Sequence, residues 1–102
     1  MDAERLALVL SALGSVPRLR IIASLEAEPT HVSELARRLG MSRPLLYQHL
    51  NRLEAAHLVE SGLEQVEENR VKKHYWVAPF RFDISPSNID HVVRQDQKEE
   101  PS

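Results

Sequence analysis

The sequence has no cysteine among its 102 residues, and this absence removes several kinds of chemistry at once. Disulfides, thiolate metal sites and cysteine nucleophiles are all excluded. No apolar run approaches the roughly 20 residues that a helix needs to cross a bilayer. The N-terminal segment also lacks the basic stretch, apolar core and cleavage site of a signal peptide. We therefore expect a soluble, cytoplasmic protein that has no membrane partner.

The sequence also lacks the short motifs that mark common enzymes. There is no glycine-rich phosphate loop and no His-Glu-x-x-His string, and the five histidines have no obvious nucleophile to activate. Internal repeats and low-complexity segments are absent as well. The chain is therefore predicted to be one domain that is not an enzyme and that needs no cofactor.

A net positive charge, which nucleic-acid-binding domains often carry, is missing too, because the formal net charge is −2. The distribution is uneven, since residues 15–53 contain six arginines and three glutamates, a net charge of +3. The remainder therefore carries −5, concentrated in residues 60–68 and after Ile89. This asymmetry permits a basic face without proving one.

What the chain does contain is a series of apolar residues at helical spacing. A first helix over residues 2–13 is favoured by acidic residues in its first turn and by Gly14 after it. Its broad apolar stripe fits either a buried helix or a dimer surface. The stripe includes Leu6, Val9, Leu10 and Leu13.

A second helix is expected to begin at Pro17, with Ser15 as its cap, because proline is tolerated in a first helical turn. It ends before Pro29, since the residue preceding a proline avoids helical angles. The spacing predicts that Leu19, Ile22 and Leu25 are buried and that Arg18 and Arg20 lie off that face.

Two short helices separated by a tight turn follow. Thr30 is expected to cap the first, which ends at Gly40 as helices commonly end at a glycine. Ser42 is expected to cap the second, whose inner seam consists of Leu46, Leu50 and Leu53. Two helices joined by a glycine-containing turn form a helix-turn-helix, and we place this motif at residues 30–56.

After Ala56 the apolar period changes from 3.6 to 2, which indicates strands. A polar stretch, Glu60–Arg70, leads into the strand Val71–Val77, so a two-stranded β-hairpin is predicted there. Residues 80–84 either extend this strand or cross the body of the domain. A last helix begins near Pro86 and carries a short apolar face of Ile89, Val92 and Val93. We place the domain at residues 1–95 and a disordered tail at 96–102.

Three segments carry a resemblance to a known family: LGSVPRLRIIASL at 13–25, VSELARRLGMSRPLLYQHLNRLEAAHLVES at 32–61, and NRVKKHYWV at 69–77. In order and spacing they are similar to the arsenic-repressor-like (ArsR/SmtB) winged-helix transcriptional regulators. The resemblance implies an α+β, mostly helical, winged helix-turn-helix fold in which the hairpin is the wing. It also implies a homodimeric repressor that binds double-stranded DNA sequence-specifically at an inverted repeat. The apolar faces of the first and last helices would form its dimer interface.

The second helix of the motif has an outward tip suited to reading base edges, because a helix in the major groove presents its N-terminal residues to the bases. Arg43 can bond to guanine, and Gln48 and Asn51 to adenine, although Asn51 also fits a solvent-facing position. Leu45 and Tyr47 offer apolar surface for a thymine methyl. The alternative is an ordinary solvated helix face.

Other polar residues are candidates for contacts with the DNA backbone, which add affinity without sequence information. They are Arg37, Arg38, Ser42, Arg52, Arg70, Lys72 and Lys73. The glutamates beside the wing cations would repel a phosphate, so a wing contact with DNA stays open. His49, at the edge of the leucine seam, is interpreted as structural.

Two alternatives to this function remain. Many members of the family sense metal ions through cysteines, which are absent here, or through Asp and His of the last helix. The candidates Asp90 and His91 are adjacent and would point about 100° apart on a helix. A zinc site needs three or four converging ligands, so no metal site is predicted, and a metal-responsive repressor is the weaker alternative. The acidic wing motivates the other, a winged-helix module that docks on a protein. No small-molecule effector is specified.

Overall fold

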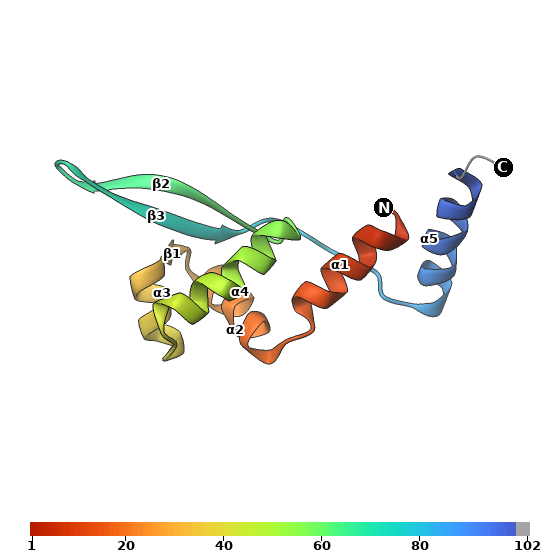
Figure 1. The fold of residues 1–102 in the computed structure, drawn as a ribbon, viewed down its shortest axis with the longest axis horizontal. Coiled ribbons are helices and arrows are strands. Elements are labelled where there is room, and N and C mark those ends of the chain that lie inside the picture. Colours follow the sequence, from red (N-terminus) through yellow and green to blue (C-terminus); the bar gives the residue numbers. More distant parts are fainter. Residues whose placement is uncertain (100–102) are drawn as a thin grey trace.

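The computed structural model describes residues 1–99, with side chains as far as residue 97. The helices are α1 (Ala3–Leu13), α2 (Val16–Ala27), α3 (Val32–Leu39), α4 (Arg43–Ala55) and α5 (Pro86–Glu99). The strands are β1 (Thr30–His31), β2 (Val59–Glu67) and β3 (Arg70–Val77). Figure 1 shows α3 and α4 as the helix-turn-helix, with the β2–β3 hairpin as a long wing. The predicted α+β, mostly helical, winged helix-turn-helix fold is confirmed.

Side-chain caps begin four of the helices. Asp2 accepts from the Arg5 amide (2.7 Å), Ser15 from the Arg18 amide (3.5 Å), Ser42 from the Leu45 amide (3.3 Å) and Ser85 from the Asn88 amide (3.1 Å). Gly40 takes the left-handed conformation (φ 61°) that ends α3, which suits a residue without a Cβ. These local signals set the boundaries of the helix-turn-helix.

The prediction that Thr30 caps α3 is wrong. Thr30 and His31 form β1, in which Thr30 is buried and pairs with Tyr75 of β3. His31 is the residue that precedes the helix, and its side chain makes no capping hydrogen bond. Pairing with a strand far along the chain holds Thr30 extended, and a local pattern cannot reveal such a partner.

The face that α2 buries also differs from the prediction. Leu19 is 51% exposed, whereas Arg18 is only 8% exposed and Ile21 is fully buried. Ile22 is half-buried against the core and Leu25 is buried as predicted. Because each residue turns a helix by about 100°, burying Arg18 and Ile21 in place of Leu19 is a modest rotation of α2. Arg18 can be buried because carbonyls at the end of α1 accept hydrogen bonds from its guanidinium. In α4, by contrast, Leu46, Leu50 and Leu53 form the predicted inner seam, all fully buried.

The three strands form an antiparallel sheet in the order β1-β3-β2. The hairpin turn uses Asn69 at a positive φ of 63°, a conformation that asparagine tolerates better than most residues. Residues 80–84 have no regular structure and lead to α5, so they do not extend the strand. α5 continues past residue 95, where the sequence placed the start of a disordered tail, and Asp96 accepts a hydrogen bond from the Ala3 amide (2.7 Å). Residues 100–102 of that predicted tail lie outside the described residues.

The chain is elongated, with extents of 58 × 27 × 22 Å. Its radius of gyration is 16.7 Å, against about 13 Å for a compact domain of about 100 residues. The wing projects at one end of the long axis, and α1 and α5 lie together at the other (Figure 1). Within residues 1–99, no helix is by itself long and apolar enough to span a membrane. Only α1 and α2 together, across an 89° bend, reach that length and composition.

Candidate nucleic-acid interface

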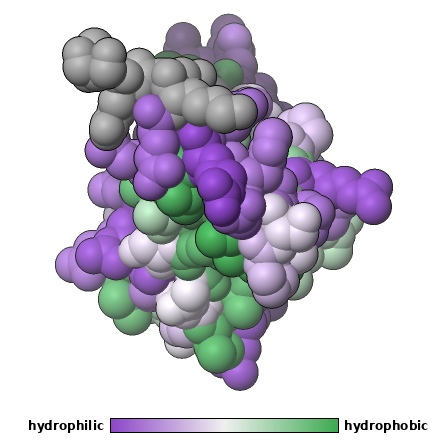
Figure 2. Space-filling view, turned by 90° about the vertical axis from the view of Figure 1, so that its right-hand side faces the viewer, coloured by the Kyte–Doolittle hydropathy of each residue, from purple (hydrophilic) through white to green (hydrophobic). Residues whose placement is uncertain are grey.

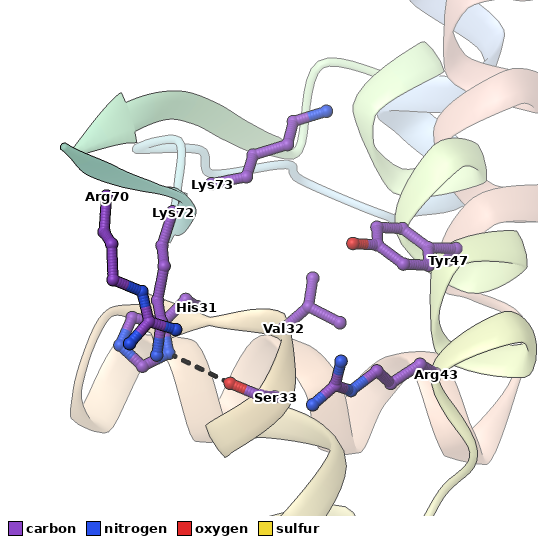
Figure 3. A pocket seen from close by; sticks show the side chains of 8 residues that line it. All are labelled: His31, Val32, Ser33, Arg43, Tyr47, Arg70, Lys72 and Lys73. Carbon is purple, nitrogen blue, oxygen red and sulfur yellow. Dashed lines mark hydrogen bonds between the residues drawn. The ribbon is translucent and has the colours of Figure 1, made fainter. Parts of the chain in front are cut away.

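An open groove of about 260 Å³ lies where the N-terminal ends of α3 and α4 meet β3 (Figure 3). Its walls come from three parts of the fold: the start of α3, the first turns of α4, and the wing. The lining residues are His31, Val32, Ser33, Arg43, Tyr47, Arg70, Lys72 and Lys73. None of these is acidic and four are cations, so the groove is suited to an anion.

Each wall contributes in a different way. Arg43 extends from the first turn of α4 toward Ser33, and the Tyr47 hydroxyl points from α4 toward the wing (Figure 3). On the opposite side Lys73 lies with its ammonium 5.4 Å from the centre of the Tyr75 ring, a favourable cation–π distance. The groove thus joins the base-reading candidates of α4 to the backbone-contacting candidates of the wing.

His31 and Ser33 line this groove, and the sequence interpretation missed both. They flank the start of α3, and the His31 Nδ1 atom lies 3.5 Å from the Ser33 hydroxyl. The available signal was their position at the N-terminus of the first helix of the motif, where unpaired amides attract phosphate oxygens.

The base-reading candidates all lie on the exposed side of α4. They are Arg43, Leu45, Tyr47, Gln48 and Asn51. Leu45 and Tyr47 leave much of their apolar surface in water, although neighbouring leucines of the same helix are fully buried. Arg43 and Tyr47 line the groove, whereas the other three lie on the α4 surface outside it.

The two arginines of α3 are engaged within the chain. Arg37 donates to Glu34 through Nε (2.9 Å), and this hydrogen bond lowers the pKa of the Glu34 carboxyl to about 2. Arg38 donates to the Glu28 carbonyl (3.0 Å) and is paired with the carboxylates of Glu28 and Glu34. A phosphate would have to compete with these carboxylates, so both arginines are weaker candidates than the groove cations.

The remaining backbone-contacting candidates differ in position. Ser42 and Arg52 are exposed at opposite ends of α4, and Ser42 also caps that helix. Arg70, Lys72 and Lys73 lie in the groove.

The wing glutamates that raised doubt about DNA contact lie mainly on β2, and β3 separates that strand from β1 and the groove. Several of them already have partners in the wing. Glu60 accepts from the Trp76 indole (2.8 Å), and Glu64 lies 2.8 Å from His74 Nδ1. Glu67 contacts Arg70 at 3.4 Å, and Glu64 is the register partner of Lys72, so two of these acids lie opposite groove cations.

Known proteins that are similar to this chain are transcriptional regulators. Residues 15–61 match the family described as bacterial regulatory protein, arsR family. An uncharacterised HTH-type transcriptional regulator of Methanocaldococcus jannaschii is 42% identical over 85 residues, covering 83% of this chain and 88% of that protein. The chain belongs to the arsR family. This membership confirms the prediction of a transcriptional regulator and not an enzyme.

Solved structures of related regulators share the fold of this arsR-family chain. NolR from Sinorhizobium fredii superposes with a TM-score of 0.64 and 29% identity, covering 95% of this chain and 86% of NolR. A possible ArsR-family regulator from Mycobacterium bovis gives a TM-score of 0.66 at 22% identity, covering 93% and 77%. That protein is described as a homodimeric winged helix-turn-helix DNA-binding domain.

The residues predicted to form the dimer interface of this arsR-family protein lie on α1 and α5, at one end of the chain. Leu6, Val9 and Val92, three of the residues predicted to contact a partner subunit, are buried within the chain. They fall inside because α1 packs against both the core and α5. Leu13 is half-buried against the core, whereas Leu10, Ile89 and Val93 remain exposed.

The metal-site candidates of the arsR family do not converge in this chain. Asp90 accepts from Arg94 Nε at 2.8 Å, and its neighbour His91 is exposed on the same helix. Among the described residues, no three His, Asp or Glu side chains come together in a way that could hold a metal ion.

Proposed function

We propose that this arsR-family protein is a sequence-specific DNA-binding repressor that acts as a homodimer. The observation that carries the proposal is the groove, in which four cations from α4 and β3 converge beside the exposed tip of α4. In this proposal α4 enters the major groove, and Arg43, Tyr47, Gln48, Leu45 and Asn51 face the bases. Arg70, Lys72, Lys73 and Ser42 contact phosphates, with Arg52 beyond them and the paired Arg37 and Arg38 contributing less.

A homodimer is supported by the shape of the chain and by its apolar end. Figure 2 views the end that carries α1 and α5, and hydrophobic side chains gather there in a band flanked by hydrophilic ones. Exposed apolar residues of these two helices include Leu8, Leu10, Ile89 and Val93. A second copy would bury this apolar surface and so raise the share of its surface that the small, elongated chain removes from water. The relative from M. bovis, described as homodimeric, supports the same arrangement.

Selection of duplexes from a random pool tests the DNA-binding proposal directly. We expect enriched sequences to contain an inverted repeat, with half-sites about one helical turn apart. Because a dimer presents two basic grooves, affinity is expected to fall on the order of a thousandfold between about 50 and about 200 mM salt. Failure to retain any duplex at low salt would remove the DNA-binding proposal and leave a protein-docking module as the alternative.

Ile89→Glu is expected to convert the dimer into a monomer at micromolar concentration, because it places a charge in the apolar surface of α5. Sedimentation of the free protein measures this change. The control is Leu63→Glu, which adds the same charge to the exposed wing and should leave the dimer intact. A wild-type protein that sediments as a monomer would contradict the proposed interface.

A further inference from the structure

Arg18 is a buried arginine whose guanidinium joins three helices. From α2, its Nε donates to the Ala12 carbonyl (2.6 Å) and its Nη2 to the Ser11 carbonyl (3.4 Å), both in the last turn of α1. Its Nη1 lies 3.1 Å from Nδ1 of His49, on the flank of α4. The side chain thus connects the end of α1 to the helix that we propose reads the bases.

The chemistry of this contact determines the protonation of His49. A guanidinium has only donors, so His49 Nδ1 must be an unprotonated acceptor and the ring proton must lie on Nε2. A doubly protonated imidazolium would turn a donor toward Nη1 and place two cations in contact. The hydrogen bond therefore exists only when His49 is neutral.

We propose that Arg18 is a positioning residue for α4 and that its proton-sensitive contact with His49 couples DNA binding to pH. Neutral His49 accepts from Arg18 and holds α4 against α2 and the end of α1. Protonation of His49 releases this contact and weakens DNA binding. The inference rests on the proposed DNA-binding function, which it extends to a means of regulation.

The surroundings of the imidazole favour its neutral form. Burial and the positive charges of Arg18, from α2, and Arg52, from α4 itself, hold the pKa of His49 below its ordinary value of 6.5. The α1 groups at this contact are the Ser11 and Ala12 carbonyls, which accept from Arg18. Because the pKa of His49 is lowered in the folded state, the stabilisation from its neutral form is fully present when the pH is above the ordinary pKa. This stabilisation is lost as the pH falls through the lowered pKa of the folded state.

Two substitutions at His49 distinguish the effect of the hydrogen-bond acceptor from the effect of protonation. His49→Asn places its side-chain oxygen near the position of Nδ1, so it can accept from Arg18 but cannot be protonated. His49→Ala removes the acceptor and leaves a buried donor unpaired. At about pH 7.5 we expect His49→Asn to bind the selected duplex like the wild type and His49→Ala to bind about tenfold more weakly. Circular dichroism and sedimentation establish that both variants are folded and share the wild-type assembly.

The pH dependence then tests the switch. We expect the ratio of the wild-type Kd to the His49→Asn Kd to be near one at about pH 8 and to rise about tenfold toward about pH 5. Taking this ratio cancels every pH effect that the two proteins share. A constant ratio, or equal binding by His49→Asn and His49→Ala at about pH 7.5, would overturn the inference while leaving the DNA-binding proposal intact.

A measurement without DNA keeps the two proposals distinguishable. Nitrogen-15 NMR of the free protein at about pH 7.5 should show the His49 proton on Nε2. A proton on Nδ1 would refute the Arg18 contact whether or not the protein binds DNA. The correct tautomer in a protein that binds no duplex would instead refute the DNA-binding proposal and, with it, the coupling to pH.

Discussion

Leu50→Ala is expected to lower the free energy of unfolding by about 2–5 kcal/mol. Leu50 is 0% exposed in the middle of α4 and belongs to the main core cluster, so its truncation leaves a cavity that close-packed neighbours fill only partly. Such a loss is a large share of the roughly 5–15 kcal/mol that stabilises a typical domain. Urea denaturation measures it as a shift of the midpoint at an unchanged slope.

The same substitution at Leu45 is the matched control. Leu45 lies on the same helix but is 44% exposed, so Leu45→Ala should change stability by no more than about 0.5 kcal/mol. Equal losses at the two positions would contradict the assignment of an inner and an outer face to α4. If Leu45 contacts a thymine methyl, its truncation should instead weaken binding to the selected duplex.

Arg43→Ala is expected to weaken binding to the selected duplex by about 1–3 kcal/mol, a factor of about 5–150 in Kd. Arg43 stands at the tip of α4 and lines the basic groove, where a bidentate bond to guanine would be lost. A base contact predicts that binding to random DNA changes much less. Competition between the selected and a scrambled duplex measures the difference.

Arg37→Ala provides the control for Arg43→Ala, because it removes the same charge from the neighbouring helix. The Arg37 side chain is 73% exposed, but it is paired with Glu34 and does not line the groove. We expect it to alter affinity by less than the Arg43 substitution does and to leave the preference for the selected duplex unchanged. Equal losses for Arg43→Ala on both duplexes would make Arg43 a phosphate contact.

The helix-turn-helix could be predicted closely because its signals are local. Ser42 caps α4 through an amide three residues away, Gly40 supplies a left-handed residue between the helices, and the leucine seam follows one helical period. Each signal acts within a few residues along the chain. For the same reason the helical spacing alone identifies the outward tip around Arg43, Tyr47 and Gln48 as a candidate surface.

The errors arose where a distant segment decided the outcome. Thr30 looked like a cap, but pairing with Tyr75 makes it a strand residue. Leu19 looked like a core residue, but carbonyls at the end of α1 draw Arg18 inward and rotate α2. Packing of α1 against the core and α5 likewise buries Leu6 and Val9, which the apolar stripe alone could equally assign to a dimer surface.

By itself, the sequence determined the family, the helix-turn-helix and the wing, because capping, periodicity and motif spacing are properties of short stretches of chain. Only the tertiary structure decided which cations share a groove, since Arg43 and Lys72 lie on separate elements that the fold brings together. It also decided the place of the wing glutamates, because the strand order sets β3 between them and the groove. The contact of Arg18 with His49 depends on the packing of three helices. Because the two residues are 31 positions apart, local sequence patterns cannot predict that they meet.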